Sequence, residues 1–222
     1  MDRNQLQEEW RRRQLVFGNT KKAVLYKNFP FFLNKNIHNQ HMQFIVKNIK
    51  LNSKNILDVG CGYGRISSEL KFRYPNINIT GIEPCKEFSN HFEAEIGPCF
   101  NGTVDEFFIS ENYDAILLIT VLMYTGNNIM SVLHKLWNSL VDGGQLICIE
   151  PAVSSLIYIR KILKCTHFLP TGRTVHYWKK KDLIGELTKL PDAQFVQVKT
   201  IGILPGIPVP TLHYCVAIRK SK

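Results

Sequence analysis

The stretch Asn55-Ile56-Leu57-Asp58-Val59-Gly60-Cys61-Gly62-Tyr63-Gly64-Arg65 decides the fold of this chain. A short apolar run of β-type residues ends in an acid, and three glycines then follow at alternate positions. A segment with helical character comes after them, so the pattern predicts a strand, a tight turn and a helix. Glycines in such a turn let a ligand lie directly against the backbone, because no Cβ stands in the way.

Length and composition limit the class of protein. The chain has 222 residues, enough for one well-buried domain and short for two. No stretch approaches the roughly 20 uninterrupted apolar residues of a membrane span, and the polar N-terminus lacks the apolar core of a signal peptide. The six cysteines include no Cys-x-x-Cys pair, so neither a zinc site nor a disulfide framework is indicated. We therefore expect a cytoplasmic protein with no membrane partner and no structural metal.

The net charge of +10 is unevenly distributed. Residues 1–57 carry 11 Lys or Arg against 3 Asp or Glu, and residues 160–222 carry 12 against 3. Residues 58–159 reverse the balance, with 5 against 12. The basic flanks are interpreted either as a surface that attracts an anionic substrate or as the solvated faces of amphipathic helices, such as the one expected at Lys179-Lys180-Lys181.

The apolar pattern divides the chain into an N-terminal segment and one larger domain. Residues 1–50 are expected to form a helical cap or lid, with helices at 1–13 and 38–50 and an irregular aromatic stretch between them. Residues 51–222 are expected to form the catalytic domain, with an insertion at about 152–180 that begins as a helix. Strands are predicted at 55–59, 78–82, 99–101, 113–119, 145–150, 195–203 and 213–219, with helices at 65–74, 86–96, 128–140 and 181–190 and a turn at 142–144. Repeated βα units of this size predict an α/β fold with a doubly wound, mostly parallel sheet of seven strands, covered by helices on both faces.

Two acids mark the ligand side of this sheet. Asp58 ends the first strand and Glu83 ends the second, and ligands of such folds bind outside the carboxyl ends of the strands. An acid at the position of Glu83 can accept hydrogen bonds from both hydroxyls of a ribose. The loop is Gly-x-Gly-x-Gly, whereas the nicotinamide fingerprint is Gly-x-Gly-x-x-Gly, and Asp58 would repel a pyrophosphate. A cationic nucleoside without phosphate, such as S-adenosylmethionine, therefore fits better.

With these features the chain resembles the class I S-adenosylmethionine-dependent methyltransferases, most clearly over residues 54–151. Leu57–Gly64 resembles the first motif of that family, 101–107 the loop that cradles adenine, 113–118 the fourth strand and 140–146 the turn into the fifth. The resemblance implies a Rossmann-like fold and S-adenosyl-L-methionine as cofactor. The implied cofactor-binding residues are Asp58, Gly60, Cys61, Gly62, Gly64, Glu83, Pro84, Thr103, Val104, Asp105 and Ile119.

The acceptor side departs from the family pattern. Many relatives carry an acid and a histidine after the fourth strand, whereas this chain has Thr120-Val121-Leu122-Met123-Tyr124. Candidates must then come from the variable segments. Glu150 is expected to hold a cationic amine or act as a base, or else to be solvated. The aromatic residues 26–32 either form a lid or pack on the sheet edge. His38 and His41 are expected to be helix surface and not a metal pair. The expected catalytic residues are Tyr26, Tyr124, Glu150 and His176, and the expected substrate-binding residues are Tyr26, Phe31, Tyr124, Glu150, Arg173, His176 and Tyr177.

These features predict a metal-independent enzyme that methylates a nitrogen or oxygen of a small molecule, working as a monomer or homodimer. Methyl transfer from a sulfonium needs mainly orientation, and the chain shows no obvious metal triad or added recognition module. The alternatives are an RNA- or peptide-modifying methyltransferase, which the basic flanks favour weakly, and a non-catalytic cofactor-binding subunit, which the missing acid favours.

Overall fold

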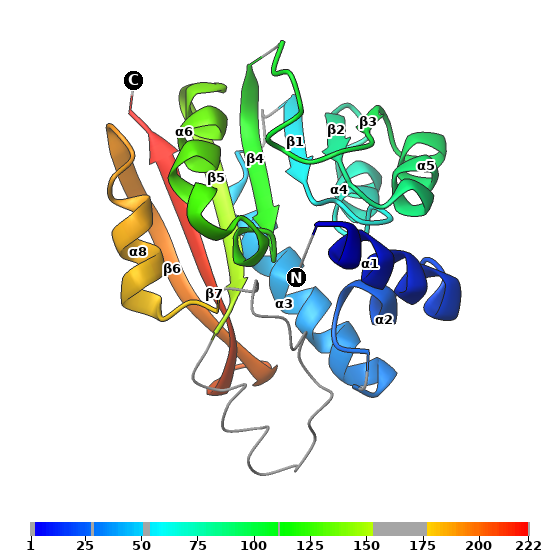
Figure 1. Cartoon of the computed structure of the whole chain (residues 1–222). Coiled ribbons are helices and arrows are strands. Elements are labelled where there is room, and N and C mark those ends of the chain that lie inside the picture. Colours follow the sequence, from blue (N-terminus) through cyan, green and yellow to red (C-terminus); the bar gives the residue numbers. More distant parts are fainter. Residues whose placement is uncertain (1–2, 28, 51–53, 111, 153–176, 222) are drawn as a thin grey trace.

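A computed structural model describes residues 3–27, 29–50, 54–110, 112–152 and 177–221. Within these ranges seven strands form one sheet, in the spatial order β3-β2-β1-β4-β5-β7-β6 (Figure 1). The first five strands run parallel to one another, whereas β7 lies antiparallel between β5 and β6. The strands are β1 (Asn55–Val59), β2 (Asn78–Ile82), β3 (Cys99–Phe100), β4 (Tyr113–Ile119), β5 (Leu140–Pro151), β6 (Ala193–Leu204) and β7 (Ile207–Lys220).

The strand order reverses between β1 and β4, which pair with each other in parallel. In doubly wound sheets this reversal opens a crevice outside the carboxyl ends of the strands, and ligands bind there. Asp58 and the glycine turn therefore lie at the topologically favoured position.

Helices cover both faces of the sheet (Figure 1). Helices α6 and α8 pack on one face, and α3, α4 and α5 pack on the other. Helix α1 and the single-turn helix α2 precede α3 and contact each other. The helices are α1 (Arg3–Phe17), α2 (Lys21–Val24), α3 (Phe31–Asn48), α4 (Ser67–Arg73), α5 (Lys86–Glu95), α6 (Ile129–Asn138) and α8 (Lys180–Leu187).

Alternate residues of the central strands supply the two halves of the core. Leu57 of β1 joins Leu133 and Trp137 of α6, while its neighbour Ile56 joins Ile45 of α3 and Leu70 of α4. All six side chains are almost completely buried. Because strand side chains alternate between faces, a near-continuous apolar strand such as β4 must be covered on both sides.

The predicted fold class is confirmed, and the limits of β1, β2 and β4 agree with the sequence prediction. Helix α2 covers Lys21–Val24 and helix α3 begins at Phe31, so the prediction that residues 19–37 are irregular was wrong for 21–24 and for 31–37. The predicted turn at 142–144 lies inside β5, where Gly143 adopts a φ of +74° and the pairing with β4 shifts register. The helix expected at 152–164 falls outside the described residues.

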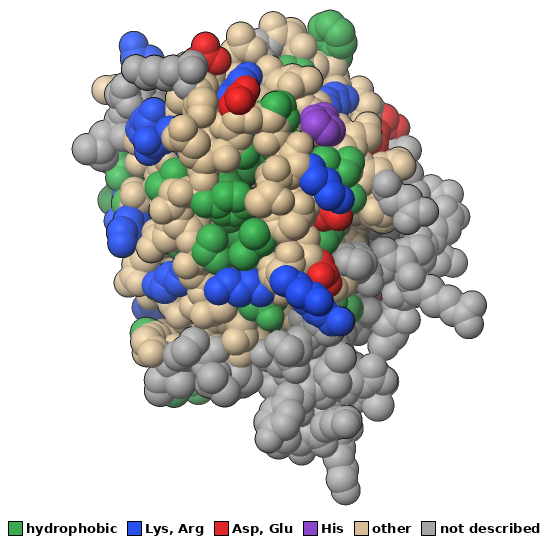
Figure 2. Space-filling view, turned by 90° about the vertical axis from the view of Figure 1, so that its left-hand side faces the viewer, with side chains coloured by type: hydrophobic (Ala, Val, Ile, Leu, Met, Phe, Trp, Pro, Cys, Tyr) green, Lys and Arg blue, Asp and Glu red, His purple; other side chains and the backbone are tan. Residues whose placement is uncertain are grey.

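The face that Figure 2 presents includes α8 and the edge strand β6. Lys179, Lys180 and Lys181 are exposed at the start of α8, while Leu183 and Leu187 of the same helix are buried. These lysines therefore form the solvated face of an amphipathic helix, as one of the two interpretations predicted. Across the described residues, none of the helices has the length and apolar character needed to cross a membrane.

Candidate functional site

The glycine turn after β1 is a tight left-handed loop. Gly60, Gly62 and Gly64 all have positive φ, at +66°, +57° and +87°. A Cβ on Gly64 would stand 1.9 Å from Cδ1 of Ile96, and one on Gly60 would stand 2.7 Å from Cγ2 of Val121. Larger residues would therefore suffer both backbone strain and steric overlap.

The two acids are buried at adjacent strand ends. The Ser67 hydroxyl donates to Oδ2 of Asp58 at 2.6 Å, and burial raises the pKa of Asp58 to about 6. Glu83 accepts backbone N–H bonds from Gly62 at 2.9 Å and from Cys85 at 2.8 Å, and burial raises its pKa to about 7. The contacts of both acids therefore fix the backbone on either side of the glycine turn, and both carboxyl groups lie at the carboxyl edge of the sheet.

The loop after β3 lies beside Glu83. The Asn101 side chain donates to the carbonyl oxygens of Glu83 and Pro84, at 3.0 and 3.3 Å. Glu106 accepts bonds from the backbone N–H and the hydroxyl of Thr103, at 2.9 and 3.0 Å. Asn101 is a residue that the sequence interpretation passed over, although an amide directly after a strand end is a recognisable signal.

The remaining predicted cofactor residues surround the same edge. Val104 is buried and Asp105 is exposed, and the carbonyl oxygens of both accept bonds from Nζ of Lys135. Ile119 ends β4 and is buried. Cys61 is also buried, with its Sγ 3.8 Å from Sγ of Cys99.

Glu150 anchors the loop after β4. Its carboxylate is fully buried and accepts backbone N–H bonds from Val121 and Leu122 at 2.8 Å and from Met123 at 3.2 Å. Burial raises the pKa of Glu150 to about 8, against the opposing effect of these three donors. The alternative of a solvated Glu150 is therefore wrong. With both oxygens engaged by the backbone, the geometry favours a positioning role over a role as base.

The same loop contains a strained residue. Thr120 has a φ of +63°, a conformation that a β-branched side chain adopts at a cost of about 1–3 kcal/mol. The three bonds to Glu150 directly follow it in the chain and hold the loop in place. Strain of this kind, held by neighbouring structure, is typical of functional sites.

The N-terminal segment packs over this edge. Trp10 of α1 meets the ring of Tyr124 edge to face at 6.1 Å between centroids, and the guanidinium of Arg13 stacks over Trp10 at 4.8 Å. Val24 of α2 stands 3.1 Å from where a Cβ on Gly62 would be. Helices α1 and α2 thus contact both the loop after β4 and the glycine turn.

Three tyrosines among the predicted acceptor residues gather beside this segment. Tyr26 stacks on Phe29 at 4.7 Å, and Tyr177 packs against the same apolar cluster. Burial raises the pKa of Tyr26, of Tyr124 and of Tyr177, the last to about 12, and the Tyr177 phenol adds to the first two shifts. The hydroxyl of Tyr177 is buried without a hydrogen-bond partner among the described residues.

Other predicted acceptor residues lie elsewhere. Phe31 is 65% exposed at the first residue of α3, so it is not gathered with the tyrosines. Arg173 and His176 fall outside the described residues.

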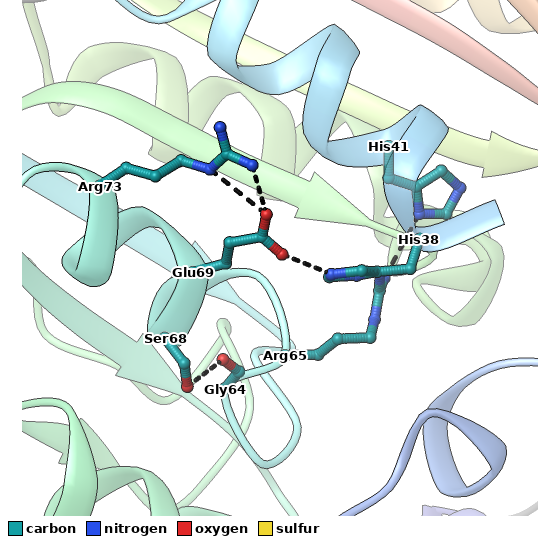
Figure 3. Close-up of polar contacts among 7 residues, drawn as sticks. All are labelled: His38, His41, Gly64, Arg65, Ser68, Glu69 and Arg73. Carbon is teal, nitrogen blue, oxygen red and sulfur yellow. Dashed lines mark hydrogen bonds and ion pairs between the residues drawn. The ribbon is translucent and has the colours of Figure 1, made fainter. Parts of the chain in front are cut away.

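His38 and His41 lie on the buried side of α3, so the prediction that they form helix surface was wrong. Figure 3 shows both rings turned toward Arg65, which follows the glycine turn. The Arg65 guanidinium donates to Nδ1 of His38 at 2.7 Å and to Nδ1 of His41 at 3.3 Å. No group of three His, Cys, Asp or Glu residues in the described part of the chain could hold a metal ion.

Comparison with known proteins agrees with this geometry. A family model described as a methyltransferase domain matches residues 57–146. A search of curated proteins finds no match. Similar solved structures include the magnesium protoporphyrin IX methyltransferase of Synechocystis PCC 6803 with bound S-adenosylhomocysteine (TM-score 0.66, 14% identity, covering 96% of this chain and 94% of that one). They also include the plantazolicin methyltransferase BpumL with S-adenosylhomocysteine (TM-score 0.64, 15% identity, covering 99% of this chain and 97% of that one). A third is the N-methyltransferase NodS of Bradyrhizobium japonicum WM9 (TM-score 0.63, 15% identity, covering 86% of this chain and 98% of that one).

The family match runs from β1 into β5, and the fold is the Rossmann-like fold of the class I S-adenosylmethionine-dependent methyltransferases. Among the similar structures, the magnesium protoporphyrin IX methyltransferase was also crystallised with S-adenosylmethionine bound. The predicted resemblance and the predicted fold are thereby confirmed, and the ligands of the similar structures agree with the predicted cofactor.

Proposed function

We propose that this enzyme methylates a nitrogen or oxygen of a small molecule without a metal ion, in the cytoplasm. The observation that carries the proposal is that Tyr26 and Tyr177 pack in one apolar cluster, while Tyr124, in the loop after β4, packs against Trp10 of the N-terminal segment. Buried phenols of this kind suit a compact, partly aromatic acceptor, with hydroxyls that orient it. The names of two similar structures specify protoporphyrin and plantazolicin as acceptors, and a third is named as an N-methyltransferase, which agrees with nitrogen as one possible target.

The cofactor would lie against the glycine turn. Glu83 is placed to bind the ribose, the loop around Thr103 and Val104 to border the adenine, and Asp58 to favour the cationic methionine end. When bound, S-adenosylmethionine supplies the electrophilic methyl group, and the residues of this chain supply orientation and exclude water.

A peptide acceptor is the second candidate, because the chain is similar over nearly its full length to the plantazolicin methyltransferase. An RNA acceptor is supported weakly by the basic flanks and the nearby aromatic residues. The lysines at the start of α8 are explained equally well as the solvated face of an amphipathic helix. Steeply salt-dependent RNA binding would restore it.

The first experiment is calorimetric titration of the chain with S-adenosylhomocysteine, with NAD and ATP as controls. We expect micromolar-range binding of S-adenosylhomocysteine alone, because Glu83 and Asp58 suit a nucleoside without phosphate. The variants Asp58→Asn and Glu83→Gln should each lose about ten- to hundredfold in affinity. Glu95→Gln is the matched control, since Glu95 is exposed on α5.

Unchanged affinity in both site variants would contradict the placement of the cofactor. After binding is established, transfer of a labelled methyl group to amines, azoles, phenols, carboxylic acids and short peptides separates the acceptor classes. Methylation of peptides alone would overturn the small-molecule proposal.

A further inference from the structure

A chain of buried polar side chains connects the glycine turn to Tyr26. Nε2 of His41 lies 3.4 Å from Nδ1 of His213 on β7, and Nε2 of His213 lies 3.4 Å from the Tyr26 hydroxyl. His41 itself accepts from Arg65, which directly follows the third glycine. The sequence positions are far apart, but the contacts form one continuous path from the cofactor side to the acceptor side.

One member of this path can only donate. An arginine guanidinium has five N–H donors and no acceptor. Nδ1 of His41, which faces Arg65, must therefore carry its lone pair toward the guanidinium. In a neutral imidazole the proton then sits on the other nitrogen, Nε2.

The direction of hydrogen-bond donation, set at Arg65, continues along the path toward Tyr26. Nε2–H of His41 donates to Nδ1 of His213, so His213 also carries its proton on Nε2 and donates to the oxygen of Tyr26. The Tyr26 hydroxyl accepts this bond, and its own hydrogen stays available for a further partner.

His38 gives the same result independently. Its Nε2 lies 2.7 Å from Oε2 of Glu69, and a carboxylate accepts, so this nitrogen carries the proton (Figure 3). Its Nδ1 therefore holds the lone pair that faces Arg65 at 2.7 Å. Burial and Arg65 lower the pKa of His38 to about 4 and of His213 to about 3, which keeps both rings neutral.

The backbone of Tyr26 is fixed as well as its hydroxyl. The Asn34 side chain accepts from the Tyr26 N–H at 3.2 Å and donates to its carbonyl oxygen at 2.9 Å. Two attachments, to α3 and to β7, thus define where the phenol lies. Burial raises the pKa of Tyr26, so the phenol keeps its proton at neutral pH.

We propose that Arg65 sets the direction of this hydrogen-bond path, so that Tyr26 meets the methyl acceptor as a hydrogen-bond donor. The inference rests on the proposed function. It selects acceptors with a lone-pair oxygen or nitrogen beside the methylated atom, such as carbonyl, carboxylate or azole groups. Tyr26 then orients the acceptor and does not remove its proton, and Arg65 is a positioning residue that acts through His41 and His213.

The test is nitrogen NMR of the full chain with labelled histidine rings. We expect His38, His41 and His213 to be neutral with the proton on Nε2. Arg65→Met removes the fixed donor and should change the ring-nitrogen signals of His41 and His213. Arg73→Met is the matched control, because Arg73 binds only the far end of the network at Glu69 and should leave those two rings unchanged.

A proton on Nδ1 of His41 or His213 in the wild-type chain would overturn the proposal, as would unchanged signals in Arg65→Met. If Arg65→Met does not fold, the wild-type spectrum decides alone. Calorimetry of Tyr26→Phe with S-adenosylhomocysteine completes the test: affinity within about twofold of wild type supports an acceptor-side hydroxyl, and a tenfold loss contradicts it. Failure of the wild-type chain to bind S-adenosylhomocysteine would contradict the proposed function instead, whatever the histidine spectra show.

Discussion

At the scale of single residues, the glycine turn depends on the absence of one carbon atom. Gly64 combines a φ of +87° with a neighbour, Ile96, that would overlap any Cβ. Gly185 in α8 differs in both respects, because it is helical and has no atom within 4 Å of where a Cβ would stand. The two positions therefore form a natural pair for mutation.

We predict that Gly64→Ala lowers the free energy of unfolding by roughly 2–4 kcal/mol, through a strained φ and overpacking against Ile96. Gly185→Ala should raise it by up to about 1 kcal/mol, because alanine is the better helix former. Chemical denaturation of both variants measures the difference. Equal effects at the two sites would show that the turn tolerates a side chain.

At the scale of elements, the sequence predicted best the apolar strands whose ends are marked by a polar residue or a glycine. Strand β1 is flanked by Lys54 and Gly60, and β4 by Asn112 and Thr120, so the limits of these two strands could be read from composition. Helix α3 was predicted to start too late because its first turn exposes Phe31 and Phe32 and buries Asn34, which reverses the usual amphipathic signal. The polar partners of the site could not be predicted, since His41 and His213 are 172 positions apart.

The loop after β4 offers a prediction at this scale. A glutamine at position 150 has one oxygen where Glu150 has two, so at least one of the amides of Val121, Leu122 and Met123 loses its acceptor. We expect Glu150→Gln to lower the free energy of unfolding by about 1–3 kcal/mol and to speed hydrogen exchange at the backbone amides of residues 121–123.

Glu186→Gln is the control for this variant, because Glu186 pairs only with Lys189 on the surface of α8. Such exposed pairs contribute little to stability. Slow exchange at residues 121–123 in Glu150→Gln would show that other contacts hold the loop.

At the scale of the whole molecule, the buried acids tie folding and cofactor binding to pH in opposite directions. The folded pKa of Glu83, about 7, lies above its ordinary value of 4.5, so the folded chain holds a proton that the unfolded chain releases. The stability that this proton contributes is fully present below about pH 4.5. The free enzyme loses it as pH rises from there to about 7. A cofactor that donates hydrogen bonds and carries positive charge favours the ionised acids instead.

We predict that affinity for S-adenosylhomocysteine rises between pH 5.5 and pH 8, as Asp58 and Glu83 ionise. Over the same range the melting temperature of the free enzyme should fall and the increase on adding S-adenosylhomocysteine should grow. Thermal denaturation with and without ligand measures both. Affinity that is independent of pH would mean that neither acid changes its protonation state on binding.

The position of β7 has a consequence for synthesis on the ribosome. Because β7 separates β5 from β6, the edge strand β6 has no partner in the sheet until the later residues of β7 have been made. The nascent chain must therefore carry β5 as an open edge while some sixty further residues emerge, and such an edge readily pairs with other chains. Because β6 and β7 pair antiparallel as consecutive strands, we expect them to join the sheet together as one hairpin, which covers the open edge of β5 in a single step.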